Sequence, residues 1–310
     1  MDAIFVHSEQ KIKERLTLNW MGTPCVEIDG HIVRLETQKA MALLAYLSLS
    51  EQPVPREALA AMFWPEFDQS HAFANLRRNL ASLDKSLGYH WIEANRSTIA
   101  LVRNKQLFID VTSYFDLIRR VRQHCGISAA PCRECLLRLE QAVALYRGEF
   151  LACLNFRDCN DFDEWQYFQR EEANQELAAS LRWLAEGYAF AGEFERAIRY
   201  ARRWVKMDHL NEEAQRLLIQ LYAQTGQRGT ALKQYEECRR LLDEELGQPP
   251  EAETVALFEK ICNGKPSPKK AFSFVLPAAF SNGAAHEPLL GTCSALTMQH
   301  YRLVHSDPLD

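Results

Sequence analysis

Three cysteines and a histidine lie close enough in the chain to hold a metal ion. Cys132 and Cys135 form a Cys-x-x-Cys pair, and His124 and Cys125 precede that pair. Thiolates and imidazoles bind zinc, and paired thiols can sense redox state. However, no second Cys-x-x-Cys follows at zinc-finger spacing, and the pair begins an expected helix whose apolar face can bury small thiols. We therefore interpret these cysteines as packing residues, and the prediction assigns no metal and no cofactor.

A second group of side chains has the chemistry to bind nucleic acid. The chain has a formal net charge of -5, but residues 71–105 contain six basic and two acidic side chains. A local basic excess is typical of a surface that binds phosphates, and an ordinary solvated face is the alternative. The residues predicted to contact DNA are His71, Asn75, Arg77, Arg78, Ser82, Lys85, Arg96 and Arg103.

These side chains have different abilities to read a base sequence. Asparagine can pair with adenine through two hydrogen bonds, and arginine can pair with guanine in the same way. We hypothesise that Asn75 and Arg78 read bases, while Arg77 binds either a phosphate or a guanine edge. Phosphate contacts position a protein on DNA without specifying a sequence. The residues expected to make them are Lys85, Arg96, Arg103 and Lys105.

The sequence offers little support for an enzyme. It lacks a nucleophile elbow, a zinc-protease helix motif, a dinucleotide fingerprint and a phosphate-binding loop, so ATP use is not indicated. No apolar run approaches the length that crosses a membrane, and the N-terminus does not resemble a signal peptide. Nine cysteines without an export signal read as free thiols. We expect a cytoplasmic protein that is neither an enzyme nor a membrane protein.

Short elements in the first third of the chain must position the basic side chains. Strands are expected at 12–18, 25–28 and 31–35, with a hairpin turn at Asp29-Gly30. Thr37 is expected to cap a first helix, Pro55 to lie in the first turn of a second, and Asp68 to cap a third. Two further strands are expected at 89–93 and 98–101. The order of a sheet, three helices and a hairpin is that of a winged helix-turn-helix.

The third helix, Asp68–Leu87, carries most of the expected DNA contacts. Its apolar residues repeat at helical spacing, so they predict a buried stripe opposite the polar face. The predicted stripe consists of Phe73, Leu76, Leu80, Leu83 and Leu87.

A 34-residue repeat marks the second half of the chain, which reads as nearly all helix. Leucine, tyrosine, glycine and alanine recur at one constant offset, which is the period of a tetratricopeptide helix–turn–helix. The repeated residues are Leu184, Tyr188, Gly192 and Ala197, then Leu218, Tyr222, Gly226 and Ala231. Such units bury their apolar faces by stacking. Helices are expected at about 112–124, 132–147, 161–190, 193–206, 211–225, 228–243 and 251–262.

The chain resembles the bacterial transcriptional activator (BTAD) family of SARP-type regulators over about residues 12–262. The resemblance rests on TQKAMALLAYL and PREALAAMFWPEFDQSHAFANLRRNLASL in the first half. In the second half it rests on LEQAVALYRGEFLACL, FDEWQYFQREEANQ and GQRGTALKQYEECRRLLDEELGQPPEAETVALFEKI. It implies an OmpR-like winged helix that binds double-stranded DNA, with Asp68–Leu87 in the major groove and 89–101 as the wing. It also implies transcriptional activation, contact with RNA polymerase and a homodimer on direct repeats.

The predicted fold is mostly α with a small β component. A winged-helix DNA-binding domain is expected at 1–108, and an all-α, tetratricopeptide-like transcriptional activator domain at 109–263. Residues 264–310 read as a linker and an undefined tail. The predicted function is a DNA-binding transcriptional regulator, an activator whose helical domain serves dimerisation, polymerase contact or signal reception. The alternative is a protein-interaction scaffold whose winged helix does not bind DNA.

Overall fold

The computed structural model describes residues 14–125 and 131–264. Within them the chain forms two compact units. The first contains residues up to Ser113 together with Arg147–Arg170, and the second contains Tyr114–Tyr146 and the residues from Glu171 onward. The start of the first expected strand and the expected tail at 265–310 lie outside the described residues.

The first unit opens with a four-stranded sheet in the order β3-β2-β1-β7. Strands β1 (Leu16–Asn19), β2 (Cys25–Ile28) and β3 (His31–Val33) are antiparallel neighbours, whereas β7 (Leu107–Ile109) lies parallel to β1. Asp29 and Gly30 have φ values of +49° and +80°, which fit the expected tight hairpin. The sequence did not predict β7.

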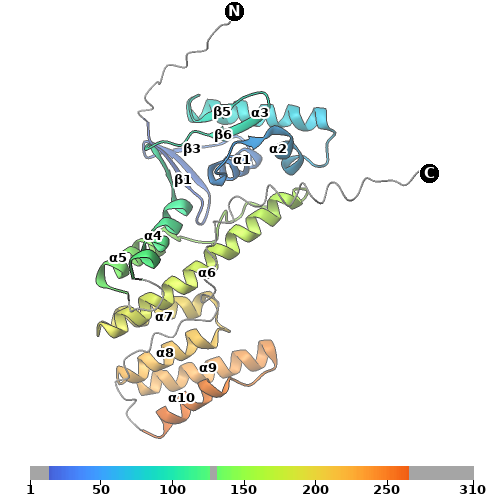
Figure 1. Cartoon of the computed structure of the whole chain (residues 1–310). Helices are drawn as coiled ribbons and strands as arrows, with labels where there is room; N and C mark the ends of the chain where they lie inside the picture. Colours follow the sequence, from blue (N-terminus) through green and yellow to red (C-terminus); the bar gives the residue numbers. More distant parts are fainter. Residues whose placement is uncertain (1–13, 126–130, 265–310) are drawn as a thin grey trace, which may run out of the picture. The chain divides into compact units, whose positions relative to one another are not determined.

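Three helices follow this sheet, and α3 packs against both α1 and α2. Helix α1 (Gln38–Leu49) begins at Thr37, whose side chain accepts a hydrogen bond from the Ala40 amide, as expected. Helix α2 spans Arg56–Phe63 and helix α3 spans Gln69–Leu87. These three helices and the sheet give the predicted winged helix-turn-helix (Figure 1).

A second sheet pairs a short strand before α2 with the hairpin that follows α3 in the sequence. Its order is β4-β6-β5, with β4 at Val54–Pro55, β6 at Thr98–Leu101 and β5 at Ile92–Ala94. Pro55 was expected in the first turn of α2, but it lies one residue before the helix. Pro55 pairs with Thr98 and stands before α2 as its N-cap, because the chain must stay extended to complete the sheet.

Residues 147–170 add an aromatic cluster to the first unit. The Phe63 ring centroid lies 5.2 Å from that of Phe162, and the Tyr46 centroid lies 5.0 Å from that of Trp165. Asp110 is buried and accepts hydrogen bonds from the Trp20 and Met21 amides, while Arg147 pairs with the same carboxylate.

The second unit is built from helices alone. Two helices, α4 and α6, contribute residues to both units. The helices are α4 (Asp110–Cys125), α5 (Arg133–Leu145), α6 (Asn160–Phe190), α7 (Phe194–Met207), α8 (Glu212–Gln224), α9 (Arg228–Leu246) and α10 (Ala252–Cys262). A continuous core runs through them, from Val121 on α4 to Ile261 on α10.

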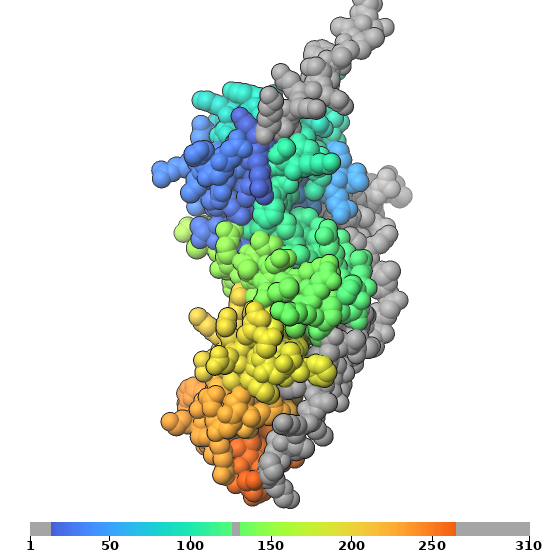
Figure 2. All heavy atoms as spheres, turned by 90° about the vertical axis from the view of Figure 1, so that its left-hand side faces the viewer, coloured from blue at the N-terminus to red at the C-terminus, as the bar shows by residue number. Residues whose placement is uncertain are grey.

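The 34-residue repeat corresponds to two helix–turn–helix units, α6–α7 and α8–α9. Both alanines of the repeat, Ala197 and Ala231, are fully buried. Both glycines end a helix with positive φ, +80° at Gly192 and +78° at Gly226. In the space-filling view, the atoms of α7 to α10, coloured yellow to red, pack directly on one another (Figure 2).

Candidate nucleic-acid interface

Helix α3 is fixed at both ends by the residues that the sequence indicated. The Asp68 carboxylate accepts hydrogen bonds from the Ser70 and His71 amides, and Gly88 closes the helix with a φ of +91°. The buried stripe includes Leu76, Leu80, Leu83 and Leu87 as expected, but Ala72 takes the place predicted for Phe73. Phe73 is half-buried and contributes to the surface instead.

The predicted contacts on α3 divide between its outward face and one flank. Arg78 and Lys85 are exposed and seven residues apart, so they lie on one outward face. Arg77 is exposed beside them, while Asn75 and Ser82 are half-buried on the flank of the helix. The structure therefore presents this cluster at the surface.

Two alanines on the same outward face were missed by the sequence analysis. Ala74 and Ala81 alternate with Arg78 and Lys85 at helical spacing, and Ala81 is exposed. Small side chains allow a helix to approach DNA closely, and an alanine methyl group can contact the methyl group of thymine. Their small size, within an otherwise polar face, is the signal in the sequence for such a contact.

A shallow, open groove between α3 and the β5–β6 hairpin is lined by three arginines. Arg77 comes from α3, Arg96 from the hairpin turn and Arg56 from the start of α2. The rest of the lining is Phe73, Ala94 and Asn95. Figure 1 shows α3 beside β5 and β6 in this unit. Arg56 was not predicted, because its place in the sequence gives no sign that it lies near Arg96.

Arg56 also fixes the hairpin turn. Its Nε donates to the Asn95 carbonyl oxygen over 2.7 Å, and its amide donates to the Ser97 carbonyl oxygen over 2.8 Å. The Asn95 side chain stabilises the turn from within, since its Oδ1 accepts from the Ser97 and Thr98 amides at 2.8 Å and 2.7 Å. The turn that carries Arg96 is thus held by α2 and by its own asparagine.

His71 is engaged locally at the start of α3. Its Nδ1 lies 2.5 Å from Asp68 Oδ2. The hydrogen bond with His71 lowers the pKa of the Asp68 carboxyl group. A carboxylate at this position also suits the positive end of the helix dipole, so His71 supports the helix start in addition to facing solvent.

Arg103 has a structural partner that the sequence did not indicate. Its guanidinium donates to the carbonyl oxygens of Ser48 and Ser50 over 2.8 Å and 2.9 Å. These carbonyls end α1 and have no partner within the helix. Arg103 therefore closes the end of α1, whereas the side chains of Lys85 and Arg96 are exposed.

The cysteine and histidine residues, which the sequence left to packing, come together in the second unit. One ligand atom from each of His124, Cys125, Cys132 and Cys135 lies within 4.8 Å of all the others. Only Cys135 is buried, Cys125 is partly exposed and Cys132 is exposed. Packing in the core therefore accounts for one of the three thiols.

Comparison with known families assigns the helical part of the chain. Residues 110–262 match the model of the bacterial transcriptional activator domain. Just under half of the chain, its helical part, is thus similar to the bacterial transcriptional activator domain family. Two similar relatives are both named transcriptional regulatory protein MoaR1, from Mycobacterium bovis (strain BCG / Pasteur 1173P2) and Mycobacterium tuberculosis (strain ATCC 25618 / H37Rv). Each is 26% identical over 253 residues, which is 80% of this chain and 79% of the relative.

A solved structure shares the fold. It is Mycobacterium tuberculosis EmbR in complex with a low-affinity phosphopeptide, with a TM-score of 0.65 and 23% identity, covering 83% of this chain and 67% of that chain. The solved structure shows the fold, while the domain match and the two relatives support a transcriptional regulator of the bacterial transcriptional activator type, which is not an enzyme class. Among the described residues, no helix has the length and apolar character needed to cross a membrane.

Proposed function

We propose that this regulator binds double-stranded DNA through α3 and the β5–β6 hairpin. The observation that carries the proposal is the groove that places Arg56, Arg77 and Arg96 between the two elements. Three cations along one groove suit the phosphates that border a DNA groove. Helix α3 then enters the major groove with its outward face, and the hairpin contacts the adjacent backbone.

The outward face of α3 divides into base contacts and phosphate contacts in this proposal. Arg78 lies at the centre of the face, between the small residues Ala74 and Ala81, so its guanidinium is free to reach a guanine edge. Asn75 reads an adjacent base from the flank, near Ser82. Lys85 lies two turns beyond Arg78 and binds a phosphate at the end of the helix.

The second part of the proposal concerns the helical domain, which we expect to contact protein partners. Stacked helical repeats offer an extended surface for protein partners. We propose that the domain supports transcriptional activation by contacting RNA polymerase and by forming a homodimer on direct repeats, in the cytoplasm. A dimer is reasonable because one small winged helix buries little surface on DNA.

The direct test is binding of the full chain to DNA from upstream of its own and neighbouring genes. Fluorescence anisotropy against a scrambled competitor would compare the wild type with Arg78→Ala and with Arg34→Ala. Arg34 is an exposed arginine of the same unit, outside the groove and α3. We expect Arg78→Ala to weaken binding to the preferred site about 10-fold or more and to relax sequence preference, since a bidentate base contact provides about 1–3 kcal/mol of discrimination.

Two outcomes would contradict the proposal. If the folded wild type shows no competitor-resistant binding, the protein-interaction scaffold becomes the better account of the winged helix. If Arg78→Ala and Arg34→Ala bind with wild-type affinity and the same preference, Arg78 does not read a base.

A further inference from the structure

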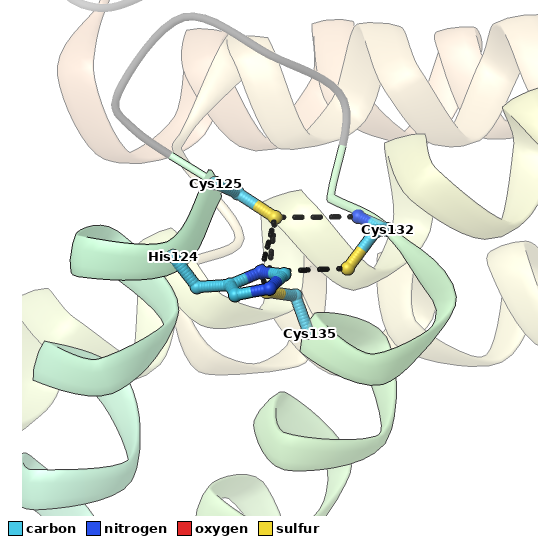
Figure 3. A group of neighbouring side chains, drawn as sticks. All are labelled: His124, Cys125, Cys132 and Cys135. Atoms are coloured by element: carbon cyan, nitrogen blue, oxygen red, sulfur yellow. Dashed lines mark hydrogen bonds between the residues drawn. The ribbon is translucent and has the colours of Figure 1, made fainter.

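Four potential metal ligands meet where α4 ends and α5 begins. His124 and Cys125 are the last two residues of α4, Cys132 immediately precedes α5, and Cys135 lies in its first turn. Figure 3 shows the three sulfur atoms and the imidazole ring turned toward one another. All four belong to the second compact unit.

The distances from the histidine to the three thiols match those of a tetrahedral zinc site. With Zn–S bonds of about 2.3 Å and Zn–N bonds of about 2.0–2.1 Å, tetrahedral geometry places sulfur and nitrogen ligands about 3.6 Å apart. His124 Nδ1 lies 3.6 Å from Cys125 Sγ, 3.7 Å from Cys132 Sγ and 3.3 Å from Cys135 Sγ. The imidazole nitrogen thus lies from each sulfur atom at about the distance that separates two ligand atoms of one zinc ion.

The sulfur atoms are arranged more tightly than a bound ion would leave them. Cys125 Sγ and Cys135 Sγ lie 2.9 Å apart, whereas two thiolates on one zinc ion lie about 3.8 Å apart. A disulfide requires about 2.05 Å. The pair therefore needs a shift of less than 1 Å toward either state, and the convergence of the histidine and the third cysteine favours the metal.

The backbone near Cys132 supports a metal-bound thiolate. The Cys132 amide donates to Cys125 Sγ over 3.4 Å. Hydrogen bonds of this kind to ligand atoms orient the ligands of metal sites.

We propose that His124, Cys125, Cys132 and Cys135 bind one zinc ion as a closed, structural Cys₃His site. All four positions are taken by protein ligands, which is the arrangement of structural rather than catalytic zinc. The ion ties the end of α4 to the start of α5. Val121 on α4 and Leu136 on α5 lie in the core of the second unit, so the ion fixes the edge of that core.

The test measures metal in the untagged full chain. Elemental analysis of protein purified without chelator should give one zinc per chain for the wild type and for Cys262→Ser, an exposed cysteine on α10 outside the cluster. Cys132→Ser should lose the zinc, and chelator should lower the midpoint of thermal unfolding of the wild type and of Cys262→Ser but not of Cys132→Ser. Cobalt added to the metal-free wild type should give tetrahedral d–d bands and thiolate charge-transfer bands, even if Cys132→Ser fails to fold.

Three results would overturn the proposal. One is a wild type that contains no stoichiometric zinc and takes up neither zinc nor cobalt after reduction. Another is zinc retained by Cys132→Ser at one per chain. The third is a Cys125–Cys135 disulfide found by mass spectrometry in freshly purified protein that fails to bind zinc once reduced, which would make the cluster a redox pair.

Discussion

At the residue scale, three arginines of the first unit have different structural roles. Arg78 stands free on the outward face of α3, Arg56 holds the hairpin turn, and Arg103 closes α1 through two carbonyl oxygens. From the sequence, both Arg78 and Arg103 were expected to contact DNA, Arg78 at a base and Arg103 at a phosphate. What separates them is the set of backbone atoms within reach, which depends on contacts between residues far apart in the chain.

Arg103→Ala should therefore reduce stability more than it reduces DNA binding. Two hydrogen bonds to helix-end carbonyls are lost, so the free energy of unfolding should fall by about 1–2 kcal/mol. Urea unfolding would measure the change, with Arg96→Ala, an exposed arginine on the hairpin turn, as the control that leaves stability unaltered. Unchanged stability together with a steep loss of DNA affinity would instead restore Arg103 as a phosphate contact.

At the element scale, the features set by neighbouring residues were predictable from the sequence. Thr37 and Asp68 cap their helices, Gly88 ends α3, and the limits of the helices in the second unit follow from apolar spacing and glycine breaks. Strands β4 and β7 were missed because each is very short and pairs with a strand distant in sequence. Short-range patterns contain no information about such partners.

The groove and the cysteine cluster also depend on residues distant in sequence, so the sequence alone could not show that these residues meet. Individual members were predicted, including Arg77 and Arg96, but the sequence could not show that Arg56 joins them. The cysteines were assigned to packing because an isolated Cys-x-x-Cys is a weak signal. Folding of α4 against α5 brings His124 to the three thiols, and this convergence was not visible in the spacing alone.

Substitution by alanine at two glycines three residues apart should change the stability of the protein in opposite directions. A Cβ atom meets nothing within 4 Å at either Gly226 or Gly229, so backbone conformation decides the outcome. Gly226 has a φ of +78°, and Gly226→Ala should destabilise the protein by about 1–2 kcal/mol. Gly229 lies within α9, where Gly229→Ala should stabilise by up to about 1 kcal/mol. Thermal unfolding would check both, and two changes of the same sign would refute the assignment.

Stability at alkaline pH should depend on the first repeat. Burial raises the pKa of Tyr188 to about 12, above the value of about 10 for an unfolded tyrosine. Tyr188 therefore keeps its hydroxyl proton to a higher pH in the folded state than in the unfolded state. The contribution of this protonated tyrosine to the free energy of unfolding is complete below pH 10 and is lost as the pH rises from about 10 to about 12.

Tyr188→Phe removes this titration while keeping the ring. Its free energy of unfolding should fall less steeply than that of the wild type between pH 9 and pH 11. Tyr167→Phe serves as the control, because the Tyr167 side chain is 57% exposed. Urea unfolding at several pH values gives the slopes, and parallel curves for the wild type and Tyr188→Phe would contradict the expectation.

At the scale of the whole molecule, a nearly neutral chain carries a localised basic surface. The formal net charge of -5 belongs to the chain, whereas the groove and the outward face of α3 present arginine and lysine side chains. Binding driven by that surface must release counterions from DNA and must therefore weaken as salt rises. A mainly apolar protein contact would not show this dependence, so salt separates the regulator from the scaffold.

The most direct test of the account is the slope of the logarithm of the DNA-binding constant against the logarithm of salt concentration. We would measure it for the full wild-type chain and for Arg77→Ala/Arg96→Ala on the same DNA. The account predicts a steep negative slope for the wild type and a slope shallower by about two for the double variant, because each lost phosphate contact reduces it by about one. A wild-type slope near zero, or identical slopes for both proteins, would contradict the central claim that this groove binds DNA.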